Sequence, residues 1–337
     1  MKKKRVEELL AIAREKKRAL IMPHNYADPD AMAAALAIKT LFKKKLKLPS
    51  IISFGGGVGR NENRVMCECL NIEITPFKDI DMEDYDLYVL VDCQPSTGNN
   101  SFPEDLTAHI IIDHHPPEGV LEGVSFVELR EDVGSSSTIV TEYLIDAGVR
   151  MDKNLASALL YGIKTDCLNF TRKTREDDLK AYLYLFRFAD LEKISLIEGA
   201  GLPKEYFKSL NGAVEDAGTY DDVLVSDLGD LSNPGAIGEF ADMFLRLEGV
   251  NTILCFGVHD ETLLISVRSL KPGVHAGKVI RYAVGKRGTA GGHETMAGGQ
   301  IRLLTETKKE EDEHKKAVIG RVFNRLGIEG KRKRKIV

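Results

Sequence analysis

The stretch TAHIIIDHHPPEG, Thr107–Gly119, joins an apolar run to ionisable side chains. Three isoleucines lead directly into Asp113, His114 and His115, and two prolines then stop the strand from continuing. A short, uninterrupted apolar run is typical of a strand that is covered on both faces, as in parallel α/β sheets. The stretch therefore predicts a strand that delivers an acid and two histidines to the edge of a buried sheet.

Other short apolar runs alternate with helical segments through the first half of the chain. This alternation predicts an α/β fold with a doubly wound, mostly parallel sheet, because parallel strands need crossover connections between them. The run Gly134–Ser137 precedes a further helix and offers a serine as its N-cap. The expected strands are Ala19–Met22, Ser50–Phe54, Leu87–Val91 and Ile110–Ile112, and the expected helices are Pro29–Lys43, Asn61–Leu70 and Asn154–Lys164.

The chain has 337 residues, which suits two domains. From Arg175 to Leu210 the pattern is helical and highly charged, and strand signals resume at Asp222–Gly229. Apolar runs at Asn251–Val258 and Thr262–Ser269, joined by a short turn, complete a smaller α/β domain. The predicted divisions are a first domain at 1–190, a helical connector at 191–219 and a second domain at 220–337.

The composition excludes several classes of partner. A formal net charge of −4 argues against a long nucleic-acid duplex or an anionic membrane surface, since both attract strongly basic proteins. No run approaches the roughly 18 apolar residues of a membrane span. Five scattered cysteines are more typical of a reducing cytoplasm than of a disulfide framework. The basic tail Lys331–Lys335 is interpreted as a solvated end, and the sequence leaves a homodimer open.

Ionisable side chains follow four segments of the first half. A single aspartate before a helix is often its N-cap, and Asp28 or Asp30 fits that role. The carboxyl ends of parallel strands, however, share one crevice in which ligands bind, so four coincident segments predict a common site. The side chains expected there are His24, Asp28, Asp30, Asp92, Asp113, His114, His115 and Asp166.

Four carboxylates in one crevice require compensation. Two like charges ~5 Å apart repel by about 3 kcal/mol at an effective dielectric constant of ~20, and several such pairs would rival the stability of a domain. Either the acids take up protons or cations lie between them. Two divalent cations would balance four charges, and carboxylates with imidazoles favour Mn²⁺ or Mg²⁺. Two metal ions ~3.5–4 Å apart form a recognised centre for hydrolysis of phosphate esters by an activated water.

In order and spacing, these residues resemble the four motifs of the DHH phosphoesterase superfamily. The resemblance implies a doubly wound catalytic domain followed by a smaller domain, with two Mn²⁺ ions, or Mg²⁺ or Co²⁺, at a shared site. It also implies that Asp92 bridges the ions, that His115 faces the scissile phosphate and that Asp113 supports the histidines. The ligands that it assigns are His24, Asp28 and Asp92 for one ion, and Asp30, Asp92, His114 and Asp166 for the other.

The stretch GKRGTAGGHETMAGGQI, Gly285–Ile301, is the second informative segment. By itself it is compatible with a tight turn before an edge strand. It resembles the Gly-Gly-His motif of the DHH-associated C-terminal domain, which implies that Gly291, Gly292 and His293 bind the nucleotide part of a substrate. Arg268 is compatible with a surface position, but it also matches an arginine that binds substrate in that domain, and a guanidinium suits phosphate.

Glycines also cluster in SFGGGVGRNENR, Ser53–Arg64. This cluster is compatible with a loop that begins a helix. It is equally compatible with a nest of backbone N–H groups that holds a phosphate, helped by Arg60 and Asn63.

The second domain and the chain length resemble one branch of the superfamily, the compact oligoribonucleases that also remove the 3′-phosphate of 3′-phosphoadenosine 5′-phosphate (nanoRNases). This resemblance implies a short oligonucleotide or a phosphorylated nucleotide as substrate. Hydrolysis of cyclic or linear dinucleotides, hydrolysis of pyrophosphate or polyphosphate, and nucleotide sensing without catalysis stay open as alternatives.

Overall fold

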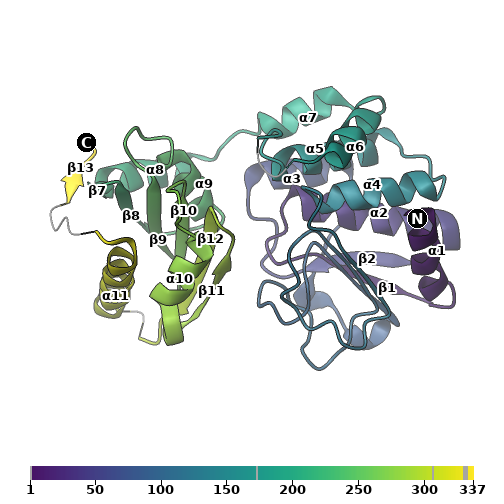
Figure 1. Cartoon of the computed structure of the whole chain (residues 1–337), viewed down its shortest axis with the longest axis horizontal. Coiled ribbons are helices and arrows are strands. Elements are labelled where there is room, and N and C mark those ends of the chain that lie inside the picture. The colour runs from purple at the N-terminus through teal and green to yellow at the C-terminus, as the bar shows by residue number, and fades with distance from the viewer. Residues whose placement is uncertain (1, 172–173, 306, 329–332) are drawn as a thin grey trace. The chain divides into compact units, whose positions relative to one another are not determined.

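The structure is a computed structural model of the chain that describes residues 2–171, 174–305, 307–328 and 333–337. Lys331 and Arg332 of the basic tail lie outside the described residues. The chain divides into two compact units, Met1–Ala200 and Gly201–Val337 (Figure 1). Both units are α/β, and the first contains a parallel sheet, which confirms the predicted fold class. Among the described residues, no helix is long and apolar enough to cross a membrane.

The first unit is built on a six-stranded sheet with the strand order β3-β2-β1-β4-β5-β6. Every neighbouring pair is parallel, and the order reverses direction next to β1, as in a doubly wound sheet. The strands are β1 (Ala19–Met22), β2 (Ser50–Phe54), β3 (Thr75–Pro76), β4 (Leu87–Val91), β5 (Ile110–Asp113) and β6 (Phe126–Leu129).

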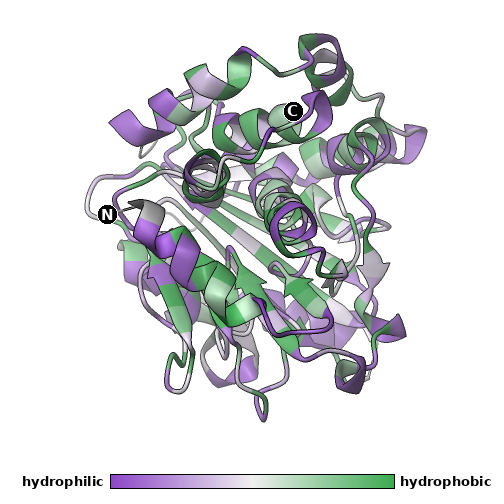
Figure 2. Ribbon diagram, turned by 90° about the vertical axis from the view of Figure 1, so that its right-hand side faces the viewer, coloured by the Kyte–Doolittle hydropathy of each residue, from purple (hydrophilic) through white to green (hydrophobic). Residues whose placement is uncertain are grey.

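The two faces of this sheet are covered differently. Side chains such as Ile21 and Val89 pack against the α-helices, whereas Leu20 and Leu90 on the other face pack under loops and two 3₁₀ turns. The segment between β4 and β5 contains two prolines and a glycine, which disfavour a helix there. The elements are α1 (Lys2–Ala13), α2 (Pro29–Leu46), α3 (Asn61–Leu70), η1 (Phe77–Asp79), η2 (Met82–Asp84), α4 (Ser136–Asp146), α5 (Lys153–Asp166), α6 (Glu176–Phe186) and α7 (Leu191–Glu198). Figure 2 shows the hydrophobic residues along the central strands.

The second unit contains a mixed seven-stranded sheet with the order β11-β12-β10-β9-β8-β7-β13. Among the strands that the structure describes in this unit, β8 and β9 pair in parallel and the other neighbouring pairs are antiparallel. Helices α10 and α11 pack on one face of the sheet, and α8 and α9 pack on the other. The elements are α8 (Lys204–Asp216), β7 (Gly218–Tyr220), β8 (Val223–Asp230), α9 (Ala236–Phe244), β9 (Thr252–His259), β10 (Thr262–Ser269), α10 (Ala276–Val284), η3 (Gly285–Arg287), β11 (Thr289–Gly292), β12 (Met296–Arg302), α11 (Lys308–Leu326) and β13 (Arg334–Lys335).

The predicted connector at 191–219 contains two helices, and each packs into a different unit. In α7, Ile194 and Ile197 are buried in the core of the first unit. In α8, Ala213 is buried in a core of the second unit. The chain passes from one unit to the other at Ala200 and Gly201.

Candidate active site

Three neighbouring strands bring the motif residues of the first unit to one edge of the sheet. β1, β4 and β5 are parallel neighbours, so the segments that follow Met22, Val91 and Ile112 emerge side by side. The first segment carries His24 and Asp28. This arrangement follows from the parallel register, which aligns the carboxyl ends of all three strands.

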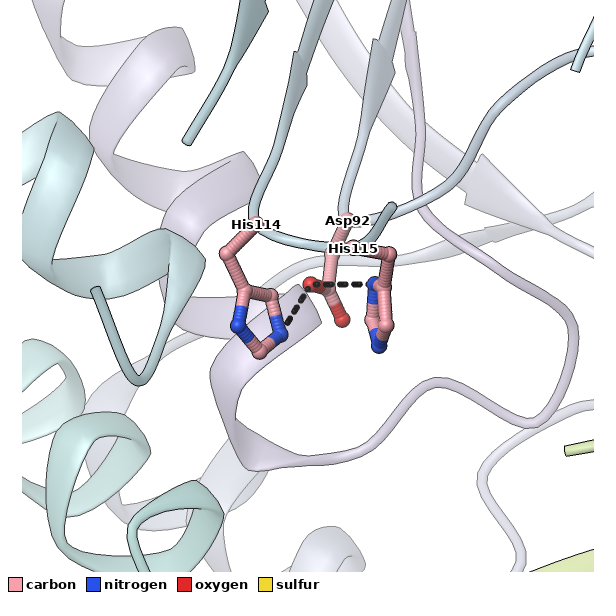
Figure 3. A group of neighbouring side chains, drawn as sticks. All are labelled: Asp92, His114 and His115. Carbon is pink, nitrogen blue, oxygen red and sulfur yellow. Dashed lines mark ion pairs between the residues drawn. The ribbon is translucent and has the colours of Figure 1, made fainter. Parts of the chain in front are cut away.

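Asp92 lies at the centre of the site. Its backbone has a φ of 58°, which is uncommon for a residue with a side chain, and its N–H donates to the carbonyl of Ile112 at 2.9 Å. Oδ2 lies 3.6 Å from Nε2 of His24, and Oδ1 lies 3.4 Å from Nε2 of His114. The imidazole rings of His114 and His115 flank the carboxylate (Figure 3). Oδ2 of Asp92 therefore faces His24, whereas Oδ1 faces His114 and His115.

Nitrogen and oxygen atoms of the predicted ligands gather into groups around Asp92. Two ligand atoms that share a divalent ion at ~2.1 Å with a near-right angle between them lie ~3 Å apart. Nε2 of His114 lies 3.2 Å from Oδ2 of Asp166, and Nε2 of His24 lies 3.8 Å from Oδ1 of Asp28. Within 4.8 Å of one another lie ligand atoms of three sets: His24, Asp28 and Asp92; Asp30, His114 and Asp166; and Asp92, His114 and His115.

Asp28 serves two purposes at the start of α2. Its Oδ1 accepts the N–H of Ala31 at 3.0 Å, so it is the N-cap of the helix. The same carboxylate lies beside His24. The capping role and the position at the site are therefore compatible, because the cap points the carboxylate toward the crevice at the helix N-terminus.

Asp30 is held by the first turn of α4. The backbone N–H groups of Ser136 and Ser137 donate to its two carboxylate oxygens at 2.7 and 2.8 Å. The hydroxyl of Ser136 donates to Oδ1 of Asp92 at 2.8 Å. One helix terminus thus orients two of the predicted ligands.

Asp113 lies behind the histidines. Its Oδ1 accepts the ring Nδ1–H of His115 at 2.7 Å and the backbone N–H of His114 at 2.8 Å. Its Oδ2 accepts from the side-chain amide of Gln94 at 2.8 Å. Asp113 is 1% exposed, whereas the His115 side chain is 31% exposed, so Asp113 orients the ring that can meet a substrate.

Burial and mutual repulsion perturb the acids of the site. Burial, followed by the charges of Asp166 and Asp28, raises the pKa of Asp30 well above its usual range. Burial and the charge of Asp30 likewise raise the pKa of Asp92. Burial opposes a charge on His24, but the Asp28 carboxylate outweighs it and raises the pKa of His24 to about 9. Divalent cations would relieve this repulsion, so the set of carboxylates and imidazoles fits a pair of such ions.

The two side chains predicted to help the glycine loop between β2 and α3 bind a phosphate, Arg60 and Asn63, contact other parts of the first unit. Asn63 is 3% exposed and donates its side-chain amide to the carbonyl of Ala27 at 3.2 Å, which ties α3 to the segment that carries Asp28. Arg60 occupies the N-cap position of α3, with its guanidinium 3.7 Å from the carboxylate of Glu62. A role for either side chain in holding a phosphate stays a prediction.

The predicted substrate residues of the second unit lie at one end of its sheet. The guanidinium of Arg268, on β10, is bound by the carboxylate of Asp242 on α9 and by the hydroxyl of Ser266. Arg268 is therefore already paired, and any phosphate would have to compete with Asp242.

The glycine stretch is ordered as an edge strand and a turn. Gly291 and Gly292 form part of β11, which pairs with β12 at the edge of the sheet. The N–H of His293 donates to the carbonyl of Met296 at 2.7 Å, and the N–H of Gly277 in α10 donates to the carbonyl of His293 at 2.9 Å. Nucleotide binding by this segment stays a prediction.

Three contributors were not foreseen from the sequence. Ser136 was recognised only as part of a helix start, although its hydroxyl contacts Asp92. Gln94 lies two residues after Asp92, and this position just beyond the end of β4 is the one feature of the sequence that could have indicated its role at the site. Gly162 lies four residues before Asp166, hence on the same face of α5. A Cβ at this position would lie only 3.1 Å from Cα of Asp30, so the absence of a side chain lets α5 approach Asp30 closely.

Comparison with known families matches residues 18–163 to the DHH family, N-terminal domain, and residues 221–322 to the DHHA1 domain. The chain belongs to the DHH family. In this DHH protein, the first matched range contains the motif residues from His24 to His115, and Asp166 lies just beyond it. The second range contains Arg268 and the glycine-histidine segment.

Several relatives of this DHH protein span both units. An uncharacterised protein of Methanocaldococcus jannaschii is 33% identical, over 89% of this chain and 62% of its own. A cyclic-di-AMP phosphodiesterase of Geobacillus thermodenitrificans is 27% identical, over 91% of this chain and 47% of its own. A manganese-dependent inorganic pyrophosphatase of Methanothrix thermoacetophila is 24% identical, over 89% and 95%. The chain thus spans less than two thirds of the first two relatives.

Among solved structures, an exopolyphosphatase-related protein of Bacteroides fragilis is similar to the DHH protein, with a TM-score of 0.69 and 14% identity. The similarity covers 96% of this chain and 97% of the other. At this identity, the comparison establishes the shared fold.

Proposed function

We propose that this DHH protein is a phosphoesterase that uses two divalent metal ions, with Mn²⁺ favoured, to hydrolyse short oligoribonucleotides or to remove the 3′-phosphate of 3′-phosphoadenosine 5′-phosphate. The observation that carries the proposal is the placement of Asp92, whose two oxygens face His24 and His114 in two separate groups of ligand atoms. A carboxylate placed in this way suits a bridge between two cations.

The ligands of the ions would be His24, Asp28 and Asp92 on one side, and Asp30, Asp92, His114 and Asp166 on the other. When bound, the two ions would activate a water and polarise the phosphoryl oxygens. The remaining chemistry belongs to the side chains around them.

His115 is the side chain placed to meet the substrate. Because its Nδ1–H is held by Asp113, its Nε2 can present a proton to a phosphoryl or leaving oxygen, and the Asp113 carboxylate would stabilise the charged ring. Gln94 and the backbone N–H groups at 114 and 115 keep Asp113 fixed. Burial raises the pKa of Asp113, but its hydrogen bond and charge interaction with His115, followed by the hydrogen bond from Gln94, outweigh burial and lower it.

A second candidate is hydrolysis of cyclic or linear dinucleotides. It is favoured by the similarity to a cyclic-di-AMP phosphodiesterase across 91% of the chain, which includes both units. Pyrophosphate hydrolysis is the third candidate, supported by the manganese-dependent pyrophosphatase relative.

Product analysis separates these candidates. The Mn²⁺-loaded protein is incubated in turn with a 5′-labelled RNA dinucleotide, a long RNA, 3′-phosphoadenosine 5′-phosphate, cyclic di-AMP and pyrophosphate. Fast mononucleotide release from the dinucleotide, with the long RNA lagging, is expected, and the His114→Ala variant should be inactive. Preferential turnover of cyclic di-AMP or pyrophosphate would replace the leading substrate, and equal activity of the variant would overturn the ligand assignment.

A further inference from the structure

A cavity of about 640 Å³ opens at the C-terminal end of α10 in the second unit. It is formed by α10, the η3 turn and α11, and no residue of the candidate active site lines it. The lining residues are Arg281, Tyr282, Gly285, Lys286, Arg287 and Arg321. Its size is within the usual range of pockets that hold nucleotide-sized ligands.

The cavity is positively charged. Four of its side chains are cationic and none is acidic. From Thr262 to His293 the sequence contains no aspartate or glutamate, although acids outnumber bases, 51 to 47, in the whole chain. Among the described residues, no carboxylate forms an ion pair with Arg281, Lys286 or Arg287. Cations that line one cavity repel one another, and a bound anion would relieve that repulsion.

The backbone is shaped to bring these cations together. Gly285 ends α10 with φ 56° and ψ −133°, a conformation that residues with a side chain rarely adopt. A Cβ at Gly285 would lie 2.7 Å from Nη1 of Arg321. Nη1 of Arg321 donates to the carbonyl oxygens of Tyr282 and Ala283, at 3.3 and 3.5 Å. The glycine therefore reverses the chain against Arg321 and places Lys286 and Arg287 in the cavity wall.

An aromatic ring lies among the cations. Tyr282 is 47% exposed, and the guanidinium carbon of Arg321 lies 5.8 Å from the centre of its ring. Exposed aromatic rings beside Arg and Lys are typical of surfaces that bind single-stranded nucleic acids, because bases stack on the ring while cations contact the phosphates. An inorganic phosphate chain would need the cations but not the ring.

We propose that this cavity binds single-stranded oligoribonucleotides, with Arg281, Lys286 and Arg287 on successive phosphates and a base stacked on Tyr282. The choice of RNA rests on the proposed function. The site itself does not depend on the metal centre, because every residue that lines it belongs to the second unit.

The test measures binding without turnover. A labelled hexaribonucleotide is titrated with the full chain in EDTA, and fluorescence anisotropy gives the affinity at several salt concentrations. Replacing two cations, in Lys286→Gln with Arg287→Gln, should weaken binding at least tenfold and reduce the salt slope by about 1.4, at about 0.7 per phosphate contact on a single strand. Tyr282→Leu should weaken binding of RNA but leave binding of tripolyphosphate unchanged.

The matched control is Arg302→Gln with Lys309→Gln, which removes the same charge from exposed positions of the second unit outside the cavity. It should bind as the unaltered protein does. Equal weakening by both double variants, or no binding by the unaltered chain, would overturn the proposal. An unchanged RNA affinity of Tyr282→Leu would assign the site to phosphate chains alone and would also overturn it. RNA binding in EDTA by a chain that is inactive with metal would contradict only the proposed function.

Discussion

The side-chain amide of Gln94 donates to the buried Oδ2 of Asp113 at 2.8 Å. Asp113 in turn accepts the ring N–H of His115. The same Gln94 accepts the N–H groups of Glu118 and Gly119 through Oε1, at 2.9 and 3.0 Å. One glutamine thus fixes both the acid behind His115 and the loop that follows it.

Replacing this glutamine should impair catalysis without emptying the metal site. Gln94→Leu would leave Oδ2 of Asp113 without its donor and loosen His115, so we expect kcat to fall about 10–100-fold with KM and metal content little changed. Steady-state kinetics and metal analysis check this. Gln300→Leu, at an exposed glutamine of the second unit, is the control. Loss of metal together with activity would place Gln94 among the supports of the ligands instead.

The shared carboxylate of Asp92 predicts a difference in metal stoichiometry. Asp92→Asn removes a charge that both ligand groups use and should abolish binding of both ions, whereas His24→Ala should weaken only one. Metal content per chain after dialysis against buffered Mn²⁺ measures this. Asp132→Asn, at an exposed acid of the same unit, should keep both ions. Retention of one tightly bound ion by Asp92→Asn would contradict the bridging role.

Removing the metals should destabilise the first unit selectively. An ion present at 100 times its dissociation constant contributes about 2.7 kcal/mol per site to the native state. All the predicted ligands belong to the first unit. We therefore expect EDTA to lower the first unit's melting transition in calorimetry while the second unit's is unchanged. Unaltered melting after verified metal removal would show that the acids do not form a cation site.

The metal-free protein should lose stability as the pH rises. The pKa values of Asp30 and Asp92 are raised in the native state, so above about pH 4 this state binds more protons than the unfolded chain. By linkage, the free energy of unfolding then falls with increasing pH, and His24, whose pKa is raised to about 9, acts in the same direction.

Melting temperatures of EDTA-treated protein between about pH 5 and about pH 9 test this linkage. We expect a decrease that is smaller in Asp30→Asn and smaller again in the metal-loaded protein. A melting temperature that rises with pH in EDTA would contradict the direction of these pKa shifts.

Gly162 permits the close approach of α5 to α2. A Cβ there would lie 2.6 Å from Oγ of Ser137 and 3.1 Å from Cα of Asp30. Gly162→Ala should therefore destabilise the protein by about 1–3 kcal/mol and weaken metal binding, because Asp166 follows on the same helix face. Denaturant unfolding and metal titration measure both effects. In Gly320→Ala the Cβ meets no atom within 4 Å in α11, so we expect no loss, and stabilisation up to about 1 kcal/mol. Equal effects of the two substitutions on stability and metal binding would contradict the view that a side chain at Gly162 cannot be accommodated against Ser137 and Asp30.

The sequence by itself determined the parallel sheet of the first unit and the convergence of its motif residues. Short uninterrupted apolar runs such as Ile110–Ile112, alternating with helical segments, are typical of covered strands, and parallel strands share one carboxyl edge. That edge brings together the segments that carry His24, Asp92 and His114. The resemblance of these motifs to the DHH superfamily, carried by the sequence alone, supplied the expectation that the Asp92 carboxylate serves two ions.

Only the tertiary structure decided which groups hold the site in place and where the second unit concentrates charge. Ser136 and Gln94 reach their acids across 44 and 19 residues of chain, and local patterns carry no information on such distant contacts. The pairing of Arg268 with Asp242 and the cationic cavity beside Gly285 likewise depend on how helices pack on a sheet. Sequence pattern sets which residues face a core or an edge, whereas side-chain partners are chosen by the packing of elements that lie far apart along the chain.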